Sequence, residues 1–154
     1  MLIVFDLDFT LWDAGGTWCD HTHPPYRHDA GNILDSHERR IYLFPDVREI
    51  LEHFFGMEIP MAIASRTHSP EAARKLMHMF EIRKYFQFEE IYPGSKRQHF
   101  ENLRRITRIP YREMYFFDDE YRNIQDTLDI GVNAYQVDSG LSWQELQELL
   151  LTNY

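Results

Sequence analysis

The sequence predicts an α/β fold, a Rossmann-like and doubly wound sheet that is mainly parallel and has five strands. A continuous apolar run at residues 2–5 predicts a strand buried on both faces. Beyond residue 44, short apolar runs alternate with segments of helical periodicity, which is the pattern of β-α-β units. The chain has 154 residues, 44% of them hydrophobic, which suits one domain with one core.

The segment after the first strand has little periodicity. It runs from Trp12 to Tyr42 and contains Gly15-Gly16 and Pro24-Pro25. A stretch of this length is either functional or holds small strands of its own, and Ile41–Phe44 suits one such strand. We expect residues 12–42 to form a flap or minimal cap on a single domain spanning residues 1–154.

Residues typical of helix starts and ends mark the next two helices, with a strand between them. Pro45 suits a first helical turn and Gly56 is a natural stop, so Pro45–Phe55 is predicted to be helical. The apolar run Ile59–Ala64 predicts a second buried strand. Ser69-Pro70-Glu71 then opens another helix, with apolar residues on its inner face.

The second half of the chain repeats the alternation. Pro110 follows one predicted helix, Gly131 ends the next, and Ser142 to Glu145 form a capping box that opens the last. In order, we expect a strand at Phe88–Tyr92, a helix at Lys96–Arg108, a strand at Glu113–Phe117, a helix at Tyr121–Ile130, a strand at Val132–Val137, and a last helix with Leu146, Leu149 and Leu150 inward.

Composition excludes several classes of function. The net charge is −9, with 16 Lys and Arg against 25 Asp and Glu, which argues against a nucleic-acid-binding module but not against a small phosphorylated ligand. Cys19 is the single cysteine, so an internal disulfide is excluded and a reducing, cytoplasmic setting is expected. No apolar run approaches the ~20 residues that span a bilayer, and Asp6 and Asp8 interrupt the N-terminal run, which excludes a signal peptide.

Polar side chains follow the predicted strands at the points where these strands end. In a parallel sheet those ends lie on one edge, so residues distant in sequence converge there. The residues are Asp6 and Asp8 after the first strand, Ser65, Arg66 and Thr67 after the second, Lys96 at the helix after the third, and Asp118 and Asp119 after the fourth.

These residue types suit phosphoryl transfer. Asp6 is the candidate nucleophile, which would become an aspartyl-phosphate. Asp8 can protonate the leaving oxygen and then take a proton from the water that cleaves the intermediate. Ser65 can donate its hydroxyl to a phosphate oxygen, and Lys96 can neutralise the phosphate and keep Asp6 charged.

A hard cation is also expected, because a carboxylate nucleophile and a phosphate dianion repel each other. Carboxylate oxygens with waters suit Mg²⁺. The predicted ligands are Asp6, the backbone carbonyl of Asp8, and Asp118.

The chain resembles the haloacid dehalogenase superfamily of phosphotransferases over essentially its whole length. Four motifs match in order: Val-Phe-Asp-Leu-Asp-Phe-Thr-Leu at 4–11, Ile-Ala-Ser-Arg-Thr at 63–67, Gly-Ser-Lys at 94–96 and Phe-Phe-Asp-Asp-Glu at 116–120. Further details are similar to the magnesium-dependent phosphatase family. They are Asp8 to Trp12, Pro45 to Arg48, Ala64 to Thr67, Tyr92 to Lys96 with His99-Phe100, and Phe117 to Ile124.

This resemblance implies the same nucleophile, general acid/base and phosphate-binding residues. Arg66, judged from its residue type and position, suits either binding of substrate or phosphate or a surface ion pair. Asp119 is implied to support the metal site through water or through Lys96, and Thr10 and Asn123 to support it as well. It also implies a small cap and activity on phosphotyrosine-like aryl phosphates or on sugar phosphates, in a phosphorylated small molecule or a phosphoprotein.

Several alternatives stay open at this stage. A phosphomutase, a nucleic-acid end phosphatase and a non-catalytic phospho-ligand module share parts of the pattern, whereas a dehalogenase would not need Asp8.

Some side chains also have two interpretations. The histidines of the flap are either zinc ligands or, as the sequence favours, solvent-facing residues; they are His21, His23 and His28. His99 either reaches the site or covers the floor of the pocket. The indole rings of Trp12 and Trp18 either line the entrance to the pocket or pack in the core.

Overall fold

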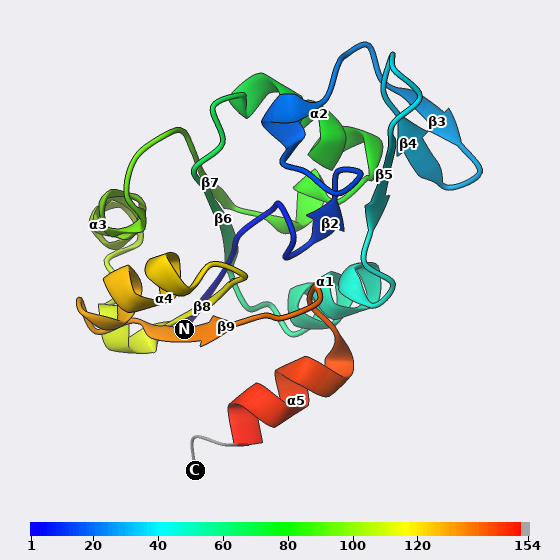
Figure 1. Cartoon of the computed structure of the whole chain (residues 1–154). Helices are drawn as coiled ribbons and strands as arrows, with labels where there is room; N and C mark the ends of the chain where they lie inside the picture. Colours follow the sequence, from blue (N-terminus) through cyan, green and yellow to red (C-terminus); the bar gives the residue numbers. More distant parts are fainter. Residues whose placement is uncertain (152–154) are drawn as a thin grey trace.

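The computed structural model describes the backbone of residues 1–151 and the side chains of residues 1–149. A sheet of five strands in the order β7-β6-β1-β8-β9 forms its centre, and every neighbouring pair is parallel (Figure 1). This is the Rossmann-like α/β fold that the sequence predicts. The strands are β1 (Leu2–Phe5), β6 (Met61–Ser65), β7 (Phe88–Ile91), β8 (Met114–Asp118) and β9 (Asn133–Gln136).

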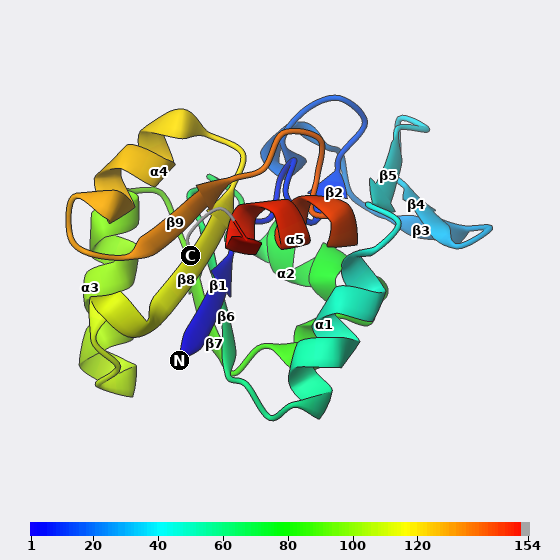
Figure 2. The same cartoon turned by 90° about the horizontal axis from the view of Figure 1, so that it is seen from below.

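Helices cover both faces of this sheet (Figure 2). One face carries α3 (Lys96–Thr107) and α4 (Tyr121–Leu128). The other face carries α1 (Val47–Gly56), α2 (Pro70–Met79) and α5 (Trp143–Leu151). Three short 3₁₀ helices, which the sequence did not predict, connect these elements: η1 (Cys19–His21), η2 (Arg83–Tyr85) and η3 (Tyr111–Glu113).

The sheet divides the core into two layers because successive side chains of a strand point to opposite faces. Along β1, Leu2 and Val4 pack in the layer under α3 and α4. Ile3 and Phe5 pack in the layer under α1, α2 and α5. All four side chains are at most 4% exposed, so β1 is the buried central strand that its uninterrupted apolar run predicts.

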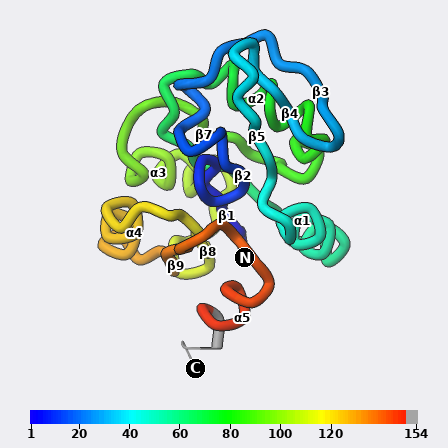
Figure 3. The backbone as a smooth tube through the Cα atoms, turned by 45° about the vertical axis from the view of Figure 1, so that its right-hand side comes forward, coloured from blue at the N-terminus to red at the C-terminus, as the bar shows by residue number. Residues whose placement is uncertain are grey.

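The insert after β1 forms a second, antiparallel sheet in the order β2-β5-β4-β3. Its outer hairpin, β3 and β4, projects beside α2 (Figure 3). The strand expected at Ile41–Phe44 is β5, and it ends one residue past the predicted flap boundary at Tyr42. The strands are β2 (Trp12–Asp13), β3 (Arg27–Asp29), β4 (Asn32–Leu34) and β5 (Arg40–Leu43).

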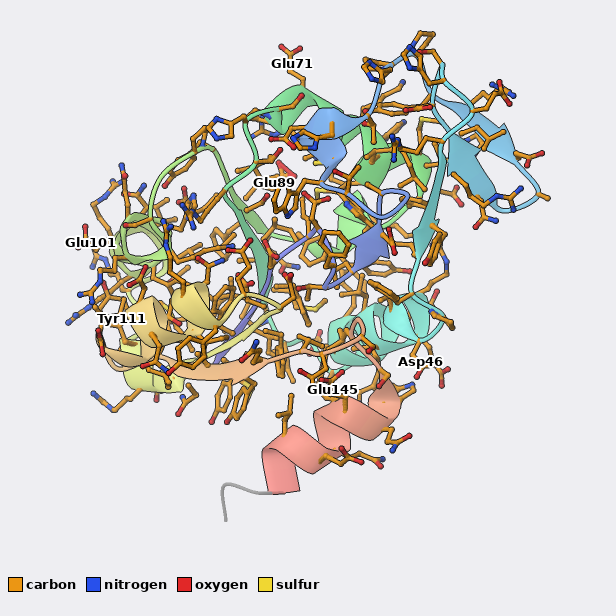
Figure 4. All side chains as sticks on the ribbon, in the orientation of Figure 1. Asp46, Glu71, Glu89, Glu101, Tyr111 and Glu145 are labelled. Atoms are coloured by element: carbon orange, nitrogen blue, oxygen red, sulfur yellow. The ribbon has the colours of Figure 1, made fainter. Side chains whose placement is uncertain are left out.

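At the start of the last helix, α5, only one of the two hydrogen bonds of the predicted capping box forms among the described residues. Ser142 Oγ accepts the Glu145 N–H at 3.1 Å, which is one half of the predicted capping box. The Glu145 carboxylate instead accepts the Asp138 N–H at 2.7 Å, while Asp46 accepts the Trp143 N–H at 3.0 Å and so ties α5 to α1 (Figure 4). Leu146 and Leu149 pack on the core as predicted; the side chain of Leu150 lies outside the described residues.

The other boundaries agree with the predicted ones within about two residues. The helix predicted from Pro45 begins at Val47, because the Asp46 carbonyl is the first to accept an intrahelical N–H, that of Ile50. None of the described helices combines the length and the hydropathy needed to cross a bilayer.

Candidate active site

A tight turn after β1 sets the positions of the two N-terminal carboxylates. The Leu7 carbonyl accepts the N–H groups of Thr10 at 3.1 Å and Leu11 at 2.8 Å. Phe9 takes a positive φ of 62°, which is uncommon outside glycine and turns the chain back on itself. Asp6 therefore directly follows β1, Asp8 projects from the turn, and both lie at the carboxyl edge of the sheet.

The predicted strand-end residues meet in one cavity of about 570 Å³. Six of them line it together: Asp6, Asp8, Ser65, Arg66, Thr67 and Lys96. Asp118 is fully buried and lies behind Lys96. Asn123, which was predicted to support the metal site, also lines the cavity. So do residues that the sequence did not assign to the site or left open, namely Trp18, Asp20, His21, His68, Glu120 and Arg122.

Lys96 is the central cation of this site. Its ammonium is 0% exposed and lies 3.0 Å from Asp6 Oδ1 and 3.2 Å from Asp118 Oδ2. It also donates a hydrogen bond to the carbonyl oxygen of Ala64. Burial alone would lower the pKa of Lys96, but the two carboxylates raise it above its ordinary value. Lys96 therefore stays charged and holds both carboxylates in place.

Asp6, Asp118 and Asp119 form a cluster in which each offers a carboxylate oxygen within 4.8 Å of the others. Burial, followed by the charge of Asp118, raises the pKa of Asp6 well above its ordinary value. Burial and Asp118 likewise raise the pKa of Asp119 to about 7. Three clustered carboxylates against one lysine leave excess negative charge, and hard oxygen ligands of this kind suit Mg²⁺. The residues present thus fit a magnesium ion.

Neighbouring groups support this cluster. Asn123 Nδ2 donates to Asp118 Oδ2 at 3.0 Å, and the Glu120 N–H donates to Asp118 Oδ1 at 2.8 Å. The Thr10 hydroxyl lies 3.5 Å from carboxylate oxygens of both Asp6 and Asp119. Asp119, which the resemblance implied to act indirectly, lies in the cluster itself, so its carboxylate is a further candidate ligand.

Asp8 lies outside the carboxylate cluster and has different surroundings. Trp12 Nε1 donates to Asp8 Oδ1 at 2.7 Å, and the Cys19 N–H donates to the same oxygen at 2.9 Å. Burial raises the pKa of Asp8 to about 6, although these donors work against the rise. Asp8 can therefore carry a proton near neutral pH, as a general acid requires.

Ser65 and Arg66, the other predicted phosphate-binding residues, line the same cavity as Asp6 and Asp8. Ser65 ends β6 and its hydroxyl oxygen accepts the Thr67 N–H at 3.3 Å. Arg66 Nε donates to the Gly94 carbonyl at 2.7 Å, and its Nη1 donates to Asn123 Oδ1 at 3.2 Å. The guanidinium is thus oriented by the protein, with N–H groups left to bind a phosphate oxygen.

The histidines divide between surface and core. His21 lines the cavity and packs edge-on against Trp18, which is 47% exposed. His23 stacks on His37 at 3.8 Å between ring centroids, away from the cavity. His28 is exposed on β3. Within residues 1–149, the group of His, Cys, Asp and Glu side chains close enough to share an ion is the aspartate cluster, so the zinc interpretation gains no support.

His99 is fully buried, and among the described residues it is not one of those that line the cavity. Its Nε2 lies 3.0 Å from the Tyr92 carbonyl oxygen, to which it donates. Its Nδ1 is buried without a hydrogen-bond partner among the described residues. Burial and the charge of Lys96 lower the pKa of His99 to about 4, so its ring is neutral.

The sequence did not assign Trp12 or Cys19 a role in catalysis. In the structure both residues donate hydrogen bonds to the Asp8 carboxylate. Trp12 is completely buried, so the packing interpretation holds for its ring, but its N–H reaches a site carboxylate. The hydrogen bond from Trp12 could have been predicted from one feature of the sequence: Trp12 follows Asp8 by four residues, across a turn. No pattern pointed to Cys19, because a backbone N–H acts there and any residue but proline has one.

Comparisons with known proteins agree with this geometry. The family model described as acid phosphatase matches residues 1–153. The chain belongs to this family. It is 42% identical to magnesium-dependent phosphatase 1 of Homo sapiens, over 98% of this chain and 85% of that protein.

Solved structures show the same fold. A haloacid dehalogenase-superfamily hydrolase from Ehrlichia chaffeensis has a TM-score of 0.68 at 15% identity and covers 97% of this chain and 95% of its own. The N-terminal part of a Bacteroides fragilis protein, containing a phosphatase domain and complexed with Mg, has a TM-score of 0.69 at 15% identity, over 96% of this chain and 39% of that one. A haloacid dehalogenase-like hydrolase superfamily protein of Schizosaccharomyces pombe is 33% identical, over 79% of this chain and 76% of that protein. The chain is therefore a phosphatase of the haloacid dehalogenase type.

Proposed function

We propose that this chain is a Mg²⁺-dependent phosphomonoester hydrolase that works through an aspartyl-phosphate on Asp6. The observation that carries the proposal is the contrast between two carboxylates in one pocket. Asp6 is paired with Lys96 and belongs to the aspartate cluster, whereas Asp8 is held by two N–H donors outside it. Two carboxylates in different surroundings are suited to two roles, nucleophile and general acid/base.

The cation would be held by Asp6, Asp118 and the backbone carbonyl of Asp8, with Asp119 as a further candidate. When bound, Mg²⁺ supplies positive charge that reduces the repulsion between the Asp6 carboxylate and a phosphate dianion. Asn123 fixes the orientation of Asp118 through its 3.0 Å hydrogen bond.

The protein's own residues carry the proton and bond changes. An Asp6 oxygen attacks phosphorus, and the bond from phosphorus to the leaving oxygen breaks as Asp8 donates a proton to that oxygen. Asp8, now a carboxylate, takes a proton from a water molecule that attacks the aspartyl-phosphate and releases phosphate and Asp6. Ser65, Arg66 and Lys96 hold the phosphate oxygens during both steps.

The substrate is proposed to be an aryl phosphate, including phosphotyrosine, or a sugar phosphate, on a small molecule or a protein. The half-exposed Trp18 at the cavity supports this, because an aromatic face can contact a flat ring or the C–H face of a sugar. The acidic net charge of −9 disfavours nucleic acid as a partner. We also place the chain in the cytoplasm, away from membranes, in keeping with its single, buried, unpaired cysteine.

Hydrolysis of p-nitrophenyl phosphate tests the proposal. Turnover should require Mg²⁺, stop with EDTA, and be abolished in Asp6→Asn. Asp29→Asn, which changes an aspartate on the outer flap hairpin, is the matched control and should keep full turnover. Turnover that persists in Asp6→Asn or in EDTA would overturn the mechanism. A well-folded wild-type protein that binds phosphate but turns over neither aryl nor sugar phosphates would favour the non-catalytic phospho-ligand module.

A further inference from the structure

The insert between β1 and β5 supplies both hydrogen bonds that hold the proposed general acid. The indole N–H of Trp12 and the backbone N–H of Cys19 converge on Asp8 Oδ1, at 2.7 and 2.9 Å. We propose that Trp12 and Cys19 are positioning residues that orient Asp8 for proton transfer, so that the insert takes part in the chemistry as well as covering the site. This inference rests on the proposed phosphatase mechanism and adds to it the source of Asp8's orientation.

Trp12 is fixed in two ways. The turn at residues 7–11 returns the chain so that the Phe9 N–H donates to the Trp12 carbonyl at 2.7 Å. The indole ring is 0% exposed and lies against Phe80, with 6.1 Å between ring centroids. A large ring in a close-packed core does not change rotamer freely, so its N–H is a rigid donor.

Cys19 is fixed at the start of η1. The Thr22 hydroxyl donates to the Cys19 carbonyl at 2.6 Å. The Cys19 sulfur lies 3.5 Å from the hydroxyl of Thr67, which lies in the loop after β6, two residues beyond Ser65. The second donor to Asp8 is therefore in contact with the loop that follows β6, and a displacement of η1 would move the Cys19 N–H relative to Asp8.

The convergence of both donors on one oxygen has a chemical consequence. Oδ1 accepts two hydrogen bonds, which leaves Oδ2 as the oxygen that carries the proton, and Asp8 lines the cavity. As the phosphorus–oxygen bond breaks, its electron pair stays on the leaving oxygen, which takes the proton from Oδ2. In the second step Oδ2 takes a proton from the attacking water. A carboxyl free to rotate would present the proton in this direction only part of the time.

Comparing two leaving groups distinguishes a misoriented Asp8 from a loss of folded protein or of phosphate binding. p-Nitrophenolate is weakly basic and leaves with little protonation, whereas the phenolate released from phenyl phosphate is more basic and depends more on the general acid. A misplaced Asp8 should therefore slow phenyl phosphate more than p-nitrophenyl phosphate. Loss of folded protein or of phosphate binding should slow both substrates equally.

Cys19→Pro removes the backbone donor, and Cys19→Ala is its matched control. Proline suits the first position of a helical turn, and the preceding Trp18 has the extended backbone (φ −81°, ψ 153°) that a following proline requires. Since general acid catalysis contributes about 10²–10⁴-fold, we expect kcat/KM, which reports the step that releases the leaving group, to fall roughly tenfold further for phenyl phosphate than for p-nitrophenyl phosphate in Cys19→Pro. Cys19→Ala keeps the N–H and should leave the ratio of the two rates unchanged.

Trp12→Phe tests the side-chain donor in the same way. Phe54→Leu is the control, because it removes an aromatic ring from the same core layer on the α1 side and does not alter the residues that hold Trp12 against Asp8. We expect the rate ratio to change in Trp12→Phe and to stay at the wild-type value in Phe54→Leu. Asp8→Asn removes the proposed general acid itself, so its rate ratio sets the largest change that a misplaced Asp8 can cause.

Three outcomes would overturn the inference. They are equal losses on both substrates in Cys19→Pro and Trp12→Phe, a Cys19→Ala ratio as altered as that of Cys19→Pro, or a Phe54→Leu ratio as altered as that of Trp12→Phe. The proposed function fails separately, through Asp6→Asn: if that variant still turns over, the mechanism itself is wrong, whatever the leaving-group ratios show.

Discussion

Replacing Lys96 with methionine would remove the buried cation that lies between two carboxylates. Its ammonium is 3.0 Å from Asp6 and 3.2 Å from Asp118, and Lys96 and Asp118 are both 0% exposed. At an effective dielectric constant of about 20, each attraction is worth roughly 5 kcal/mol before the desolvation of the charges is subtracted. Breaking a buried pair by removing one partner costs about 3–5 kcal/mol, because the remaining charge is left uncompensated. We expect a loss of that size for Lys96→Met.

The assay is urea unfolding of the wild-type and variant proteins in EDTA, so that metal binding does not contribute. Lys75→Met is the matched control: Lys75 is exposed on α2, and its loss should change the free energy of unfolding by less than about 0.5 kcal/mol.

The pH dependence of the loss has a definite sign. Without Lys96 the pKa of Asp6 rises further above its unfolded value of 3.8, so the folded variant binds more protons than the unfolded one. Stability of the variant then falls as pH rises through this range, and the loss should be larger at about pH 8 than at about pH 5. A Lys96→Met protein within about 1 kcal/mol of wild type at the higher pH would refute this account of the buried triad.

Three further predictions concern single residues. Because the pKa of His99 is lowered from 6.5 to about 4, stability should fall as pH drops through that interval, by about 3 kcal/mol, and His99→Gln should lack this component; parallel stability curves would contradict it. Arg66→Lys cannot reproduce the two contacts that orient the guanidinium, so KM should rise roughly tenfold with a smaller change in kcat, and an unchanged KM would exclude Arg66 from substrate binding. Asn123→Ala removes the donor to Asp118, so the Mg²⁺ concentration for half-maximal activity and for thermal stabilisation should rise about 10–100-fold; an unchanged Mg²⁺ dependence would show that Asn123 does not support the metal site.

The parallel sheet was predictable because its signals are local. The apolar run of β1 and the helix starts at Pro70 and Lys96 depend on residues adjacent in sequence. Parallel geometry then brings the strand ends together without any contact having to be known. The same geometry is why Ser65 and Lys96 could be placed at one edge with Asp6.

The insert was less predictable because long-range polar contacts hold it. β3 consists of three polar residues, Arg27–Asp29, with no alternation of apolar side chains to mark it. The turn between β4 and β5 is organised by the Asp35 carboxylate, which accepts the N–H groups of His23, His37 and Arg39 at 2.8–3.0 Å. Such contacts have no period in the sequence.

Contacts between side chains of the site were equally hard to predict from the sequence. Lys96 was expected to neutralise phosphate and keep Asp6 charged, but its position between Asp6 and Asp118 depends on burial that the sequence does not state. The carboxylate of Asp119 lies in the cluster because the backbone after β8 turns at Asp118, where the Glu120 N–H donates to its side chain.

Detection of the phosphorylated residue tests the central claim most directly. Wild-type protein and Asp8→Asn, which should cleave the intermediate slowly, would be mixed with p-nitrophenyl phosphate and Mg²⁺, quenched with acid and digested for mass spectrometry. The account predicts one phosphoryl group on the peptide containing Asp6, more abundant in Asp8→Asn and absent in Asp6→Asn. A phosphoryl group on another residue, or none in an Asp8→Asn protein that releases a full burst of p-nitrophenolate, would contradict it.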